Sequence, residues 1–557
     1  MSASAEGTSG VRLPGGDLAD GGNWNLAARL ERTAARLPAK AALWADSGDV
    51  SFRELDERSS AVAGGLSELG VSPGERVAVM GGSHVQLIVT IYGVWKLGAI
   101  VVAVNNQLGP AEVRQHLANS EPVVVVVDTG RSCEIVEQAA MGLSRAPRVV
   151  TMGEVDGPPL SAMQLGPGAD ATIFYTSGTT GVPKGATHTH RAHRVQLEMV
   201  ALRYALTEDD VMLSALPIYL LSILVLGPLL SVHVGSTCRL MARYEALAFA
   251  HHVKADHTTI IGATIPMMFS DLYALPPEQA ADVDLSSVRI ASCGGSPMPP
   301  EIRRSFEERY DFRFLHAYGG TEGPAMVSTD PLDRERKFDS VGVPLPHILV
   351  TVEDDAGQRL APGEVGEICT ASMTEGPFAG WYEPMRAYWG MPGETAEALR
   401  GGRLHWGDLG YLDEDGFIYL VDRKKDMIIR GGMNVYPKEL EKLLYADARI
   451  AECAVVGAGH ARYGEVPWAF VRVAPGTTIS EGEVRSLVGD HAARFKHLGG
   501  VTFVADFPRN ALGKVLKREL RRDLPDCTVT DCSATQDELS DGPQRPDVAV
   551  DEHGRDD

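Results

Sequence analysis

Five consecutive valines occupy residues 123–127, and Asp128 follows them directly. An uninterrupted β-branched run of this kind is typical of a central strand that is buried on both faces of a parallel sheet. Before it, the pattern predicts a strand near residues 76–80, a helix near 85–97 and a strand at 99–104. Strand and helix go on alternating well past residue 300, so we expect an α/β protein with a large N-terminal domain of doubly wound layers.

The chain has 557 residues, which exceeds the size of one ordinary domain. A charged stretch, DRKKD at residues 422–426, separates two apolar runs, and residues 427–523 beyond it show a small α+β pattern. The C-terminal end is acidic and poor in aromatic residues, which favours disorder. The expected organisation is a disordered N-terminus at 1–24, an N-terminal domain at 25–422, a short connection at 423–426, a small C-terminal domain at 427–523, and a disordered acidic tail at 524–557.

The amino-acid composition indicates which classes of binding partner and which cellular compartment to expect. A net charge of −22 argues against broad binding to nucleic acid or to an anionic membrane. The seven cysteines are scattered and form no CxxC pair, and residues 1–22 do not resemble a signal peptide, so a cytoplasmic location is expected. The apolar segment 216–230 is interrupted by Pro217, Gly227 and Pro228 and is too short for a bilayer span, which favours buried core.

Residues 175–185 read YTSGTTGVPKG and combine glycines, hydroxyl side chains and one lysine. They follow a short buried strand at 172–174 and precede a helical pattern that begins near residue 191. A strand, a Gly/Ser/Thr-rich loop and a helix in this order predict a cradle for phosphate groups, because backbone N–H groups, hydroxyls and a lysine all attract an anion. The spacing differs from the GxxxxGK[ST] of P-loop NTPases.

Further motifs follow this loop along the chain. They are SCGGSP at 292–297, AYGGTEG at 317–323, GEVGEI at 363–368, GDLG at 407–410, DRKKD at 422–426, GGMNVYP at 431–437 and PRNALGKVLK at 508–517. In type and order the series resembles the acyl-adenylate-forming superfamily, which holds acyl-CoA synthetases, peptide-synthetase adenylation domains and beetle luciferases. The resemblance covers roughly residues 25–523, and an ordered series of this length is far more specific than any one motif.

The resemblance implies a nucleotide site. The residues that would hold the β- and γ-phosphates are Thr176, Ser177, Gly178, Thr179, Thr180, Gly181 and Lys184. Glu322 would hold Mg²⁺, helped by the hydroxyl of Thr179 or Thr321. Asp408 would accept hydrogen bonds from both ribose hydroxyls, and Arg423 would reach the ribose or the α-phosphate. The residues that would enclose the adenine are Gly294, Gly295, Ser296, Ala317, Tyr318 and Gly319, with the Tyr318 ring stacked on the base.

The resemblance also implies how the C-terminal domain takes part. Lys514 matches the lysine that bridges the attacking carboxylate and the α-phosphate. Lys425 occupies the position of the hinge about which this domain turns between two half-reactions. After that turn, Gly431 and Gly432 would line a channel for the pantetheine arm of coenzyme A.

Two positions depart from the superfamily's pattern. After Pro217 the family often has an aromatic residue and then a histidine, whereas this chain has Tyr219 and Leu220. Trp406 stands where the family commonly has threonine. Tyr219, Leu220 and Met298 are the candidate acyl-pocket residues, within a wall expected from residues 216–230, 260–269 and 294–298. The aspartate that binds an amino group in peptide-synthetase domains is missing, which favours a hydrophobic aliphatic, alicyclic or aromatic acid.

Two histidine groups could suggest a second metal. One comprises His188, His190 and His193, and the other His251, His252 and His257. Neither spacing fits a known ligand set well, so we expect surface or capping roles for both.

The expected activity is that of an acid–thiol ligase, which makes an acyl-CoA from a carboxylic acid through acyl-AMP and uses ATP, Mg²⁺ and CoA. Four alternatives remain open. They are a loader of carrier-protein pantetheine, an enzyme of thioester formation alone that receives its adenylate from a partner, a luciferase-like oxygenase, and a nucleotide-binding regulator without turnover. The protein is expected to be a monomer or homodimer.

Overall fold

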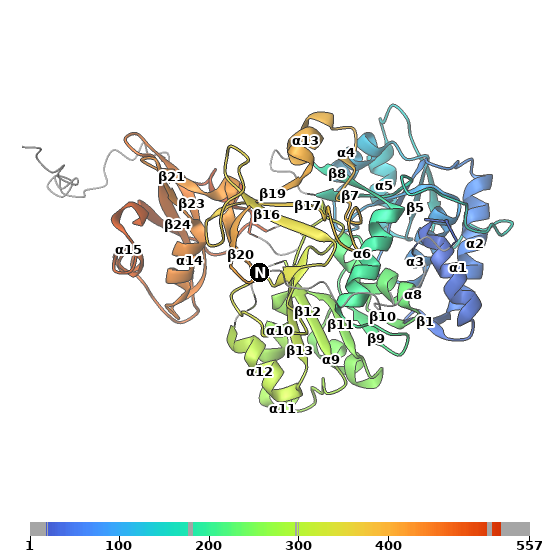
Figure 1. The fold of residues 1–557 in the computed structure, drawn as a ribbon, viewed down its shortest axis with the longest axis horizontal. Helices are drawn as coiled ribbons and strands as arrows, with labels where there is room; N and C mark the ends of the chain where they lie inside the picture. Colours follow the sequence, from blue (N-terminus) through green and yellow to red (C-terminus); the bar gives the residue numbers. More distant parts are fainter. Residues whose placement is uncertain are drawn as a thin grey trace, which may run out of the picture. The chain divides into compact units, whose positions relative to one another are not determined.

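The computed structural model describes residue 18 and residues 21–176, 182–295, 298, 300–509 and 515–524. The chain divides between Leu420 and Val421 into two compact units (Figure 1). The first unit contains two large sheets covered by helices and one small antiparallel sheet. The second unit is a small α+β body with its own sheet.

The first large sheet has the strand order β18-β8-β7-β4-β3-β5-β6. Its strands from β7 to β6 are parallel, and β8 and β18 are added antiparallel at one edge. The strands are β3 (Arg76–Met80), β4 (Ile100–Ala103), β5 (Val124–Val127), β6 (Arg148–Thr151), β7 (Asp170–Thr176), β8 (Lys184–Thr189) and β18 (Ala387–Tyr388).

The valine run explains why this sheet is covered on both faces. Val124 and Val126 of β5 belong to the core that also contains α3, whereas Val125 and Val127 pack in a second core with α4 and α5. All four side chains are fully buried. The predicted doubly wound α/β class is therefore confirmed.

The second large sheet has the order β15-β14-β13-β12-β11-β9-β10-β1-β2. The six strands from β13 to β1 are parallel, and the outer strands are antiparallel. The strands are β1 (Ala41–Ala45), β2 (Val50–Ser51), β9 (Val211–Ser214), β10 (Thr237–Leu240), β11 (Ile260–Thr264), β12 (Ile290–Gly294), β13 (Arg313–Tyr318), β14 (Ser328–Thr329) and β15 (Val343–Pro344).

The helices of the first unit cover these sheets (Figure 1). They are α1 (Leu26–Arg36), α2 (Phe52–Glu68), α3 (Val85–Lys96), α4 (Pro110–Ser120), α5 (Arg131–Ala140), α6 (His190–Arg203), α7 (Leu221–Leu224), α8 (Leu230–Val234), α9 (Ala246–Ala255), α10 (Pro266–Tyr273), α11 (Pro277–Ala280), α12 (Pro300–Tyr310) and α13 (Pro392–Ala398). A π-helical turn at Val225–Leu229 and a 3₁₀ turn at Arg400–Gly402 complete them.

The small sheet of the first unit has the order β16-β17-β19-β20. Its strands are β16 (Ile348–Glu353), β17 (Gly366–Ser372), β19 (Leu404–Leu412) and β20 (Ile418–Arg423), and the last three residues of β20 already belong to the second unit. The pairs β16–β17 and β17–β19 are antiparallel. This sheet matters for function because β19 contains both Trp406 and Asp408.

The second unit is built around a five-stranded sheet in which β22, β21, β24 and β23 follow one another and β25 pairs with β24. Its elements are 3₁₀ turns at Lys424–Asp426 and Arg494–Lys496, the strands β21 (Ile428–Arg430), β22 (Met433–Val435), β23 (Ile450–His460), β24 (Gly464–Val473) and β25 (Gly500–Phe503), and the helices α14 (Pro437–Tyr445), α15 (Glu481–Gly489) and α16 (Lys517–Leu520). Aliphatic side chains from β21, β23, β24, α14 and α15 form its core.

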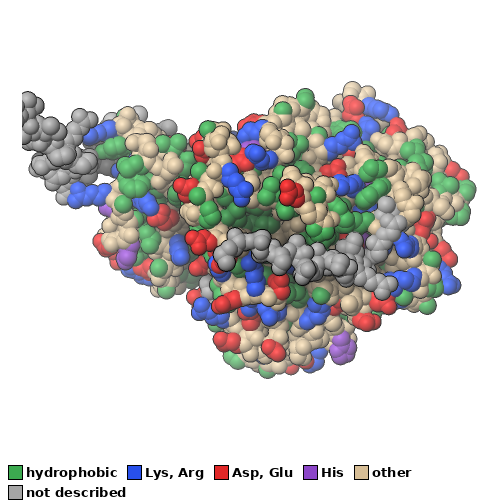
Figure 2. Space-filling view, viewed as in Figure 1, with side chains coloured by type: hydrophobic (Ala, Val, Ile, Leu, Met, Phe, Trp, Pro, Cys, Tyr) green, Lys and Arg blue, Asp and Glu red, His purple; other side chains and the backbone are tan. Residues whose placement is uncertain are grey.

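The apolar segment at residues 216–230 forms part of the first unit's core, as the sequence predicts. Its π-helical turn contains Pro228, and a Cβ at Gly227 would lie 3.1 Å from Ser214 Oγ, so this turn packs closely against β9. Among the helices of the described residues, none combines the length and the apolar character that crossing a bilayer requires. On the face that Figure 2 shows, acidic and basic side chains are interspersed.

Candidate nucleotide and acyl site

The predicted phosphate loop joins two antiparallel strands. β7 ends at Thr176 and β8 begins at Lys184, and these two residues pair across the hairpin. The helix predicted from about residue 191 is α6, which begins at His190, but a strand that was not predicted, Lys184–Thr189, pairs with β7 between the loop and this helix. Ser177, Gly178, Thr179, Thr180 and Gly181 lie outside the described residues.

Tyr388 connects this hairpin to the predicted magnesium carboxylate. Its hydroxyl donates to Glu322 Oε1 at 2.9 Å, and Lys184 Nζ lies over its ring, 5.0 Å from the centroid. Burial, and then the charge of Glu322, raise the pKa of Tyr388. The phenol therefore stays protonated and acts as a donor at neutral pH. Tyr388 was not among the site residues predicted from the sequence.

The segment around Tyr388 is fixed to both parts of the site by its backbone. Met385 N–H donates to the carbonyl of Glu322 at 2.7 Å, and Trp389 N–H donates to that of Gly185 at 2.7 Å. Tyr388 itself pairs with Ala186 in the sheet. These backbone hydrogen bonds therefore fix the position of the loop that contains Glu322 relative to the β7–β8 hairpin.

Three buried histidines lie behind the site, and the expectation of a surface role for them is wrong. His188 Nε2–H donates to the carbonyl of Thr321 at 2.6 Å, and His193 Nε2 lies 2.8 Å from Thr172 Oγ1. His190 Nδ1 accepts from Leu26 N–H at 3.1 Å. They are buried because β8 is covered on this side by α6. Burial lowers the pKa of His188 to about 4 and that of His190 to about 3.

The other histidine group behaves as expected. His251 and His257 are exposed, and His252 is half-buried on α9.

The predicted adenine and ribose residues come from the ends of β12 and β13 and from the middle of β19. Tyr318 closes β13, and its hydroxyl donates to Asp408 Oδ2 at 2.8 Å. Gly294 lies opposite Ala317, and a Cβ at Gly294 would be 2.9 Å from the Ala317 carbonyl oxygen. The backbone at Gly319 is packed equally closely, since a Cβ added there would be 2.3 Å from the Ala325 carbonyl oxygen. Gly295 is described at the end of β12, whereas Ser296 lies outside the described residues.

Trp406 fills the space beside these residues. Its ring centroid is 5.5 Å from that of Tyr318, and its Nε1–H donates to Thr370 Oγ1 at 3.0 Å. A Cβ at Gly323 would lie 2.8 Å from the indole ring, and one at Gly320 would lie 3.0 Å from it. The bulky departure from the superfamily's threonine is therefore accommodated by two glycines of the AYGGTEG motif.

A small apolar cavity of about 10 Å³ lies near the predicted acyl wall. Tyr219, Ile218 and Leu224 line one side of it, and the remaining lining comes from α3, from β3, β4 and β7, and from the residues that follow β3 and β4. Leu220 and Met298 do not line this cavity, nor do residues 260–269. Leu220 packs half-buried against the core, and Met298 is buried. The contributions of α3 and the first sheet were not foreseen, because they depend on how the two large sheets pack.

Four of the predicted residues that the structure describes lie in the second unit. Arg423 N–H donates to Asp422 Oδ1 at 2.7 Å. Burial lowers the pKa of Lys425, which lies in the 3₁₀ turn Lys424–Asp426. Gly431 and Gly432 have φ angles of 58° and 83°, a conformation that side chains with a Cβ rarely adopt. Lys514 lies outside the described residues.

The fold is a two-sheet α/β unit followed by a small α+β unit, and it agrees with the adenylate-forming class that the sequence motifs predict. Comparison with known proteins gives the family. The model of the AMP-binding enzyme family matches residues 30–382, and that of the AMP-binding enzyme C-terminal domain matches residues 439–514.

Similar proteins agree with this assignment. A feruloyl-CoA synthase of Amycolatopsis sp. is 35% identical over 476 residues, which are 85% of this chain and 94% of that protein. A fatty acid–[acyl-carrier-protein] ligase, ScoC of Streptomyces coeruleorubidus, is 31% identical over 518 residues, which are 87% of this chain and 93% of that protein. The crystal structure of ATP-bound MatB from Rhodopseudomonas palustris has a TM-score of 0.81 and 29% identity, and the match covers 91% of this chain and all of that one (100%).

The chain belongs to the AMP-binding enzyme family. It is an acid–thiol ligase of the adenylate-forming type, and its co-substrates and cofactor are those of the family, namely ATP, CoA and Mg²⁺.

Proposed function

We propose that the protein converts a hydrophobic carboxylic acid (aliphatic, alicyclic or aromatic) to its CoA thioester through an acyl-AMP intermediate. The observation that supports this most is that Tyr388 contacts both Lys184 and Glu322. A cation and a carboxylate therefore lie at the start of β8, directly after the glycine-rich loop. The apolar lining next to Tyr219 favours a hydrophobic acid. The feruloyl-CoA synthase is named for an aromatic acid.

In the first half-reaction a carboxylate oxygen of the acid forms a bond to the α-phosphorus of ATP, and the bond from that phosphorus to the β-phosphate oxygen breaks. Both partners are anionic, so the enzyme must neutralise and align them. In our proposal Lys184 holds the terminal phosphates, Asp408 holds the ribose, and Tyr318 stacks on the adenine. Pyrophosphate is the leaving group.

Glu322 fits the role of a magnesium ligand. It is half-buried, and Mg²⁺ prefers carboxylate oxygens. A carboxylate has about four lone-pair sites, so the hydrogen bond from Tyr388 leaves capacity for a cation. When bound, Mg²⁺ supplies charge neutralisation at the phosphates.

In the second half-reaction the CoA sulfur forms a bond to the acyl carbonyl carbon, the bond to the AMP oxygen breaks, and the thiol proton is released. We propose that the second unit turns about Lys425 between the two steps. That turn would exchange Lys514 for the Gly431–Gly432 loop at the site.

Lys514 provides the test of this assignment. A unit charge near 4 Å from the reacting oxygens, at an effective dielectric constant of 20, is worth about 4 kcal/mol, which is on the order of a thousandfold in rate. We expect Lys514→Ala to abolish pyrophosphate release from acid and ATP, yet to keep thioester formation from a supplied acyl-adenylate. Lys442→Ala removes an exposed lysine of α14 and serves as the control. Equal loss of both steps in Lys514→Ala would contradict the proposed role.

The main alternative to this proposal concerns the thiol that accepts the acyl group. ScoC is named for transfer to an acyl carrier protein, so a carrier-protein pantetheine is the second candidate. A panel of hydrophobic acids, with ATP and either CoA or a pantetheinylated carrier protein, separates the two acceptors when pyrophosphate and thioester are measured independently. Thioester without pyrophosphate, from supplied adenylate only, would identify an enzyme of the second half-reaction alone. Pyrophosphate formed with amino acids but not with hydrophobic acids would contradict the proposed substrate class.

A further inference from the structure

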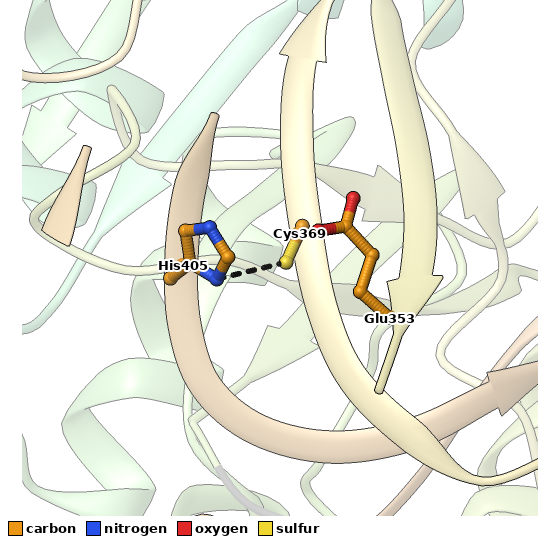
Figure 3. Close-up of side chains that lie close together, drawn as sticks. All are labelled: Glu353, Cys369 and His405. Atoms are coloured by element: carbon orange, nitrogen blue, oxygen red, sulfur yellow. Dashed lines mark hydrogen bonds between the residues drawn. The ribbon is translucent and has the colours of Figure 1, made fainter. Parts of the chain in front are cut away.

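Three side chains with metal-binding atoms converge on one face of the small sheet. Glu353 ends β16, Cys369 lies in β17 and His405 lies in β19 (Figure 3). Cys369 is opposite Thr351 on one side and His405 on the other, and Glu353 is two residues beyond Thr351, so all three point to the same face. One carboxylate oxygen, one sulfur and one imidazole nitrogen lie within 4.8 Å of one another.

The cluster is removed from solvent. Cys369 has no exposed surface, Glu353 is 3% exposed, and the His405 side chain is 7% exposed. Buried polar groups are normally satisfied by a partner, since an unsatisfied one costs about 1–3 kcal/mol. Glu353 Oε1 accepts from Thr351 at 2.8 Å and from Arg403 at 3.0 Å, but Glu353 Oε2 is buried and has no hydrogen-bond partner.

We propose that Glu353, Cys369 and His405 bind a divalent transition metal of the Zn²⁺ type. A thiolate, an imidazole and a carboxylate together suit a borderline-soft ion, whereas Mg²⁺ and Ca²⁺ prefer oxygen ligands alone. This site is separate from the one proposed at Glu322 and does not depend on the proposed substrate.

The observed spacing is close to what such an ion needs. Ligand distances of about 2.0–2.3 Å in a tetrahedral arrangement place neighbouring ligand atoms roughly 3.3–3.6 Å apart. Cys369 Sγ and His405 Nδ1 are 3.2 Å apart. The third atom must move inward by about an ångström, a shift that side-chain rotation of Glu353 can supply. Glu367 Oε2, 3.4 Å from His405 Nδ1, or a water molecule would complete the coordination.

The charges of the cluster also suit an ion. Metal binding replaces the proton of the Cys369 thiol, and the ion neutralises the thiolate and the Glu353 carboxylate. Arg403 and Arg400 compensate Glu353 and Glu367 in the absence of metal.

Such an ion would tie three strands together next to the nucleotide site. His405 precedes Trp406, and Glu367 Oε1 accepts from Gly407 N–H at 3.2 Å, immediately before Asp408. The role we infer is therefore structural: the metal fixes the part of β19 from which Trp406 and Asp408 project.

The test uses the full chain, stripped of metal with a chelator and then titrated with Co²⁺, which reports thiolate ligation by an absorption band. We expect one equivalent to bind with a sulfur-to-cobalt charge-transfer band, and Zn²⁺ to displace it. Cys369→Ser should lose the band, whereas Cys453→Ser, which changes another buried cysteine outside the cluster, should keep it. Absence of the band in the wild-type chain, or its persistence in Cys369→Ser, would overturn the proposal.

A second variant guards against misfolding of Cys369→Ser. Glu353→Gln keeps the side-chain shape but weakens an anionic ligand. We expect Zn²⁺ to raise the midpoint of thermal unfolding of the wild-type chain by several degrees and to raise that of Glu353→Gln less. Equal shifts in both proteins would show that the stabilising ion is bound elsewhere, which also contradicts the proposal.

Discussion

At the scale of single residues, Tyr388 has the most consequential contacts in the candidate site. It touches Glu322 through its hydroxyl and Lys184 through its ring, while its backbone belongs to β18. One side chain thereby orients both charged groups that the proposed mechanism assigns to Mg²⁺ and phosphate. Its role is one of positioning, since it need not touch the reacting atoms.

Tyr388→Phe tests this role. Losing a hydrogen bond to a charged group costs about 1.5–3 kcal/mol, so the rate of adenylation should fall about tenfold to a hundredfold. The Mg²⁺ concentration for half-maximal rate should rise as well, because Glu322 is no longer held in place. Pyrophosphate release is measured over a Mg²⁺ series. Tyr310→Phe, which removes a hydroxyl bonded to the Val283 carbonyl far from the nucleotide residues, is the control. An unchanged Mg²⁺ dependence in Tyr388→Phe would contradict the positioning role.

Single residues also show which contacts a sequence motif cannot predict. The motif AYGGTEG identifies Glu322, but nothing in it identifies Tyr388, which lies 66 positions further along the chain. The contact depends on β18 pairing with β8 at the sheet edge. A two-residue strand of this kind has too short a pattern to be recognised.

At the scale of elements, the loop after β13 and the strand β19 are shaped to each other. Trp406 occupies the room that Gly320 and Gly323 leave, and it packs at the same time on Tyr318. The packing of the large ring therefore depends on the absence of side chains at the two glycines. Changing either partner alone should disturb the nucleotide pocket.

Gly323→Ala should destabilise the first unit, because the added Cβ would lie 2.8 Å from the Trp406 ring. Overpacking of this kind costs about 1–3 kcal/mol. The double variant Gly323→Ala with Trp406→Thr should recover most of the loss, and denaturant unfolding measures both. Gly393→Ala meets no atom within 4 Å in the described structure and should be neutral. Additive losses in the double variant would show that the two positions are not coupled.

The three buried histidines at the junction of β8 and α6 predict that the stability of the fold decreases at acidic pH. The ordinary pKa of histidine is 6.5, whereas in the folded state that of His188 is about 4, that of His190 about 3, and that of His193 well below the ordinary value. Between pH 6.5 and 4 the unfolded chain therefore binds more protons than the folded one, and stability falls as the pH is lowered.

The measurement is the midpoint of thermal unfolding between pH 7 and pH 5. His193→Gln removes one of the titrating groups and should show a weaker pH dependence. His251→Gln, at an exposed position of α9, should follow the wild-type curve. Parallel curves for wild type and His193→Gln would exclude this histidine as a source of the acid sensitivity.

At the scale of the whole molecule, the proposed reaction needs both units. The first contains Lys184, Glu322 and Asp408, and the second contains Arg423, Lys425 and the glycine pair. Gly432 has a φ of 83°, yet a Cβ there would meet no described atom within 4 Å. Within the unit, glycine is favoured at this position by the backbone conformation, and the proposed CoA channel supplies a second reason.

Gly432→Leu separates these reasons. The variant should block thioester formation and leave pyrophosphate release from acid and ATP intact, since only the second step uses the channel. Gly432→Ala introduces the same backbone strain with far less bulk, so it should keep much of the thioester activity. Assays of the two half-reactions give the comparison. Thioester synthesis by Gly432→Leu at the wild-type rate would rule out the channel assignment.

The fold class and the family could be predicted from the amino-acid sequence. Runs such as residues 123–127 reveal burial locally, and the ordered motifs identify the acyl-adenylate-forming enzymes. Three features become visible only in the folded chain: Tyr388 contacts both Lys184 and Glu322, β8 separates the predicted phosphate loop from α6, and Glu353, Cys369 and His405 converge. The physical reason is that sheet pairing and packing bring together residues far apart in the chain, whereas local patterns report only which face of an element is buried.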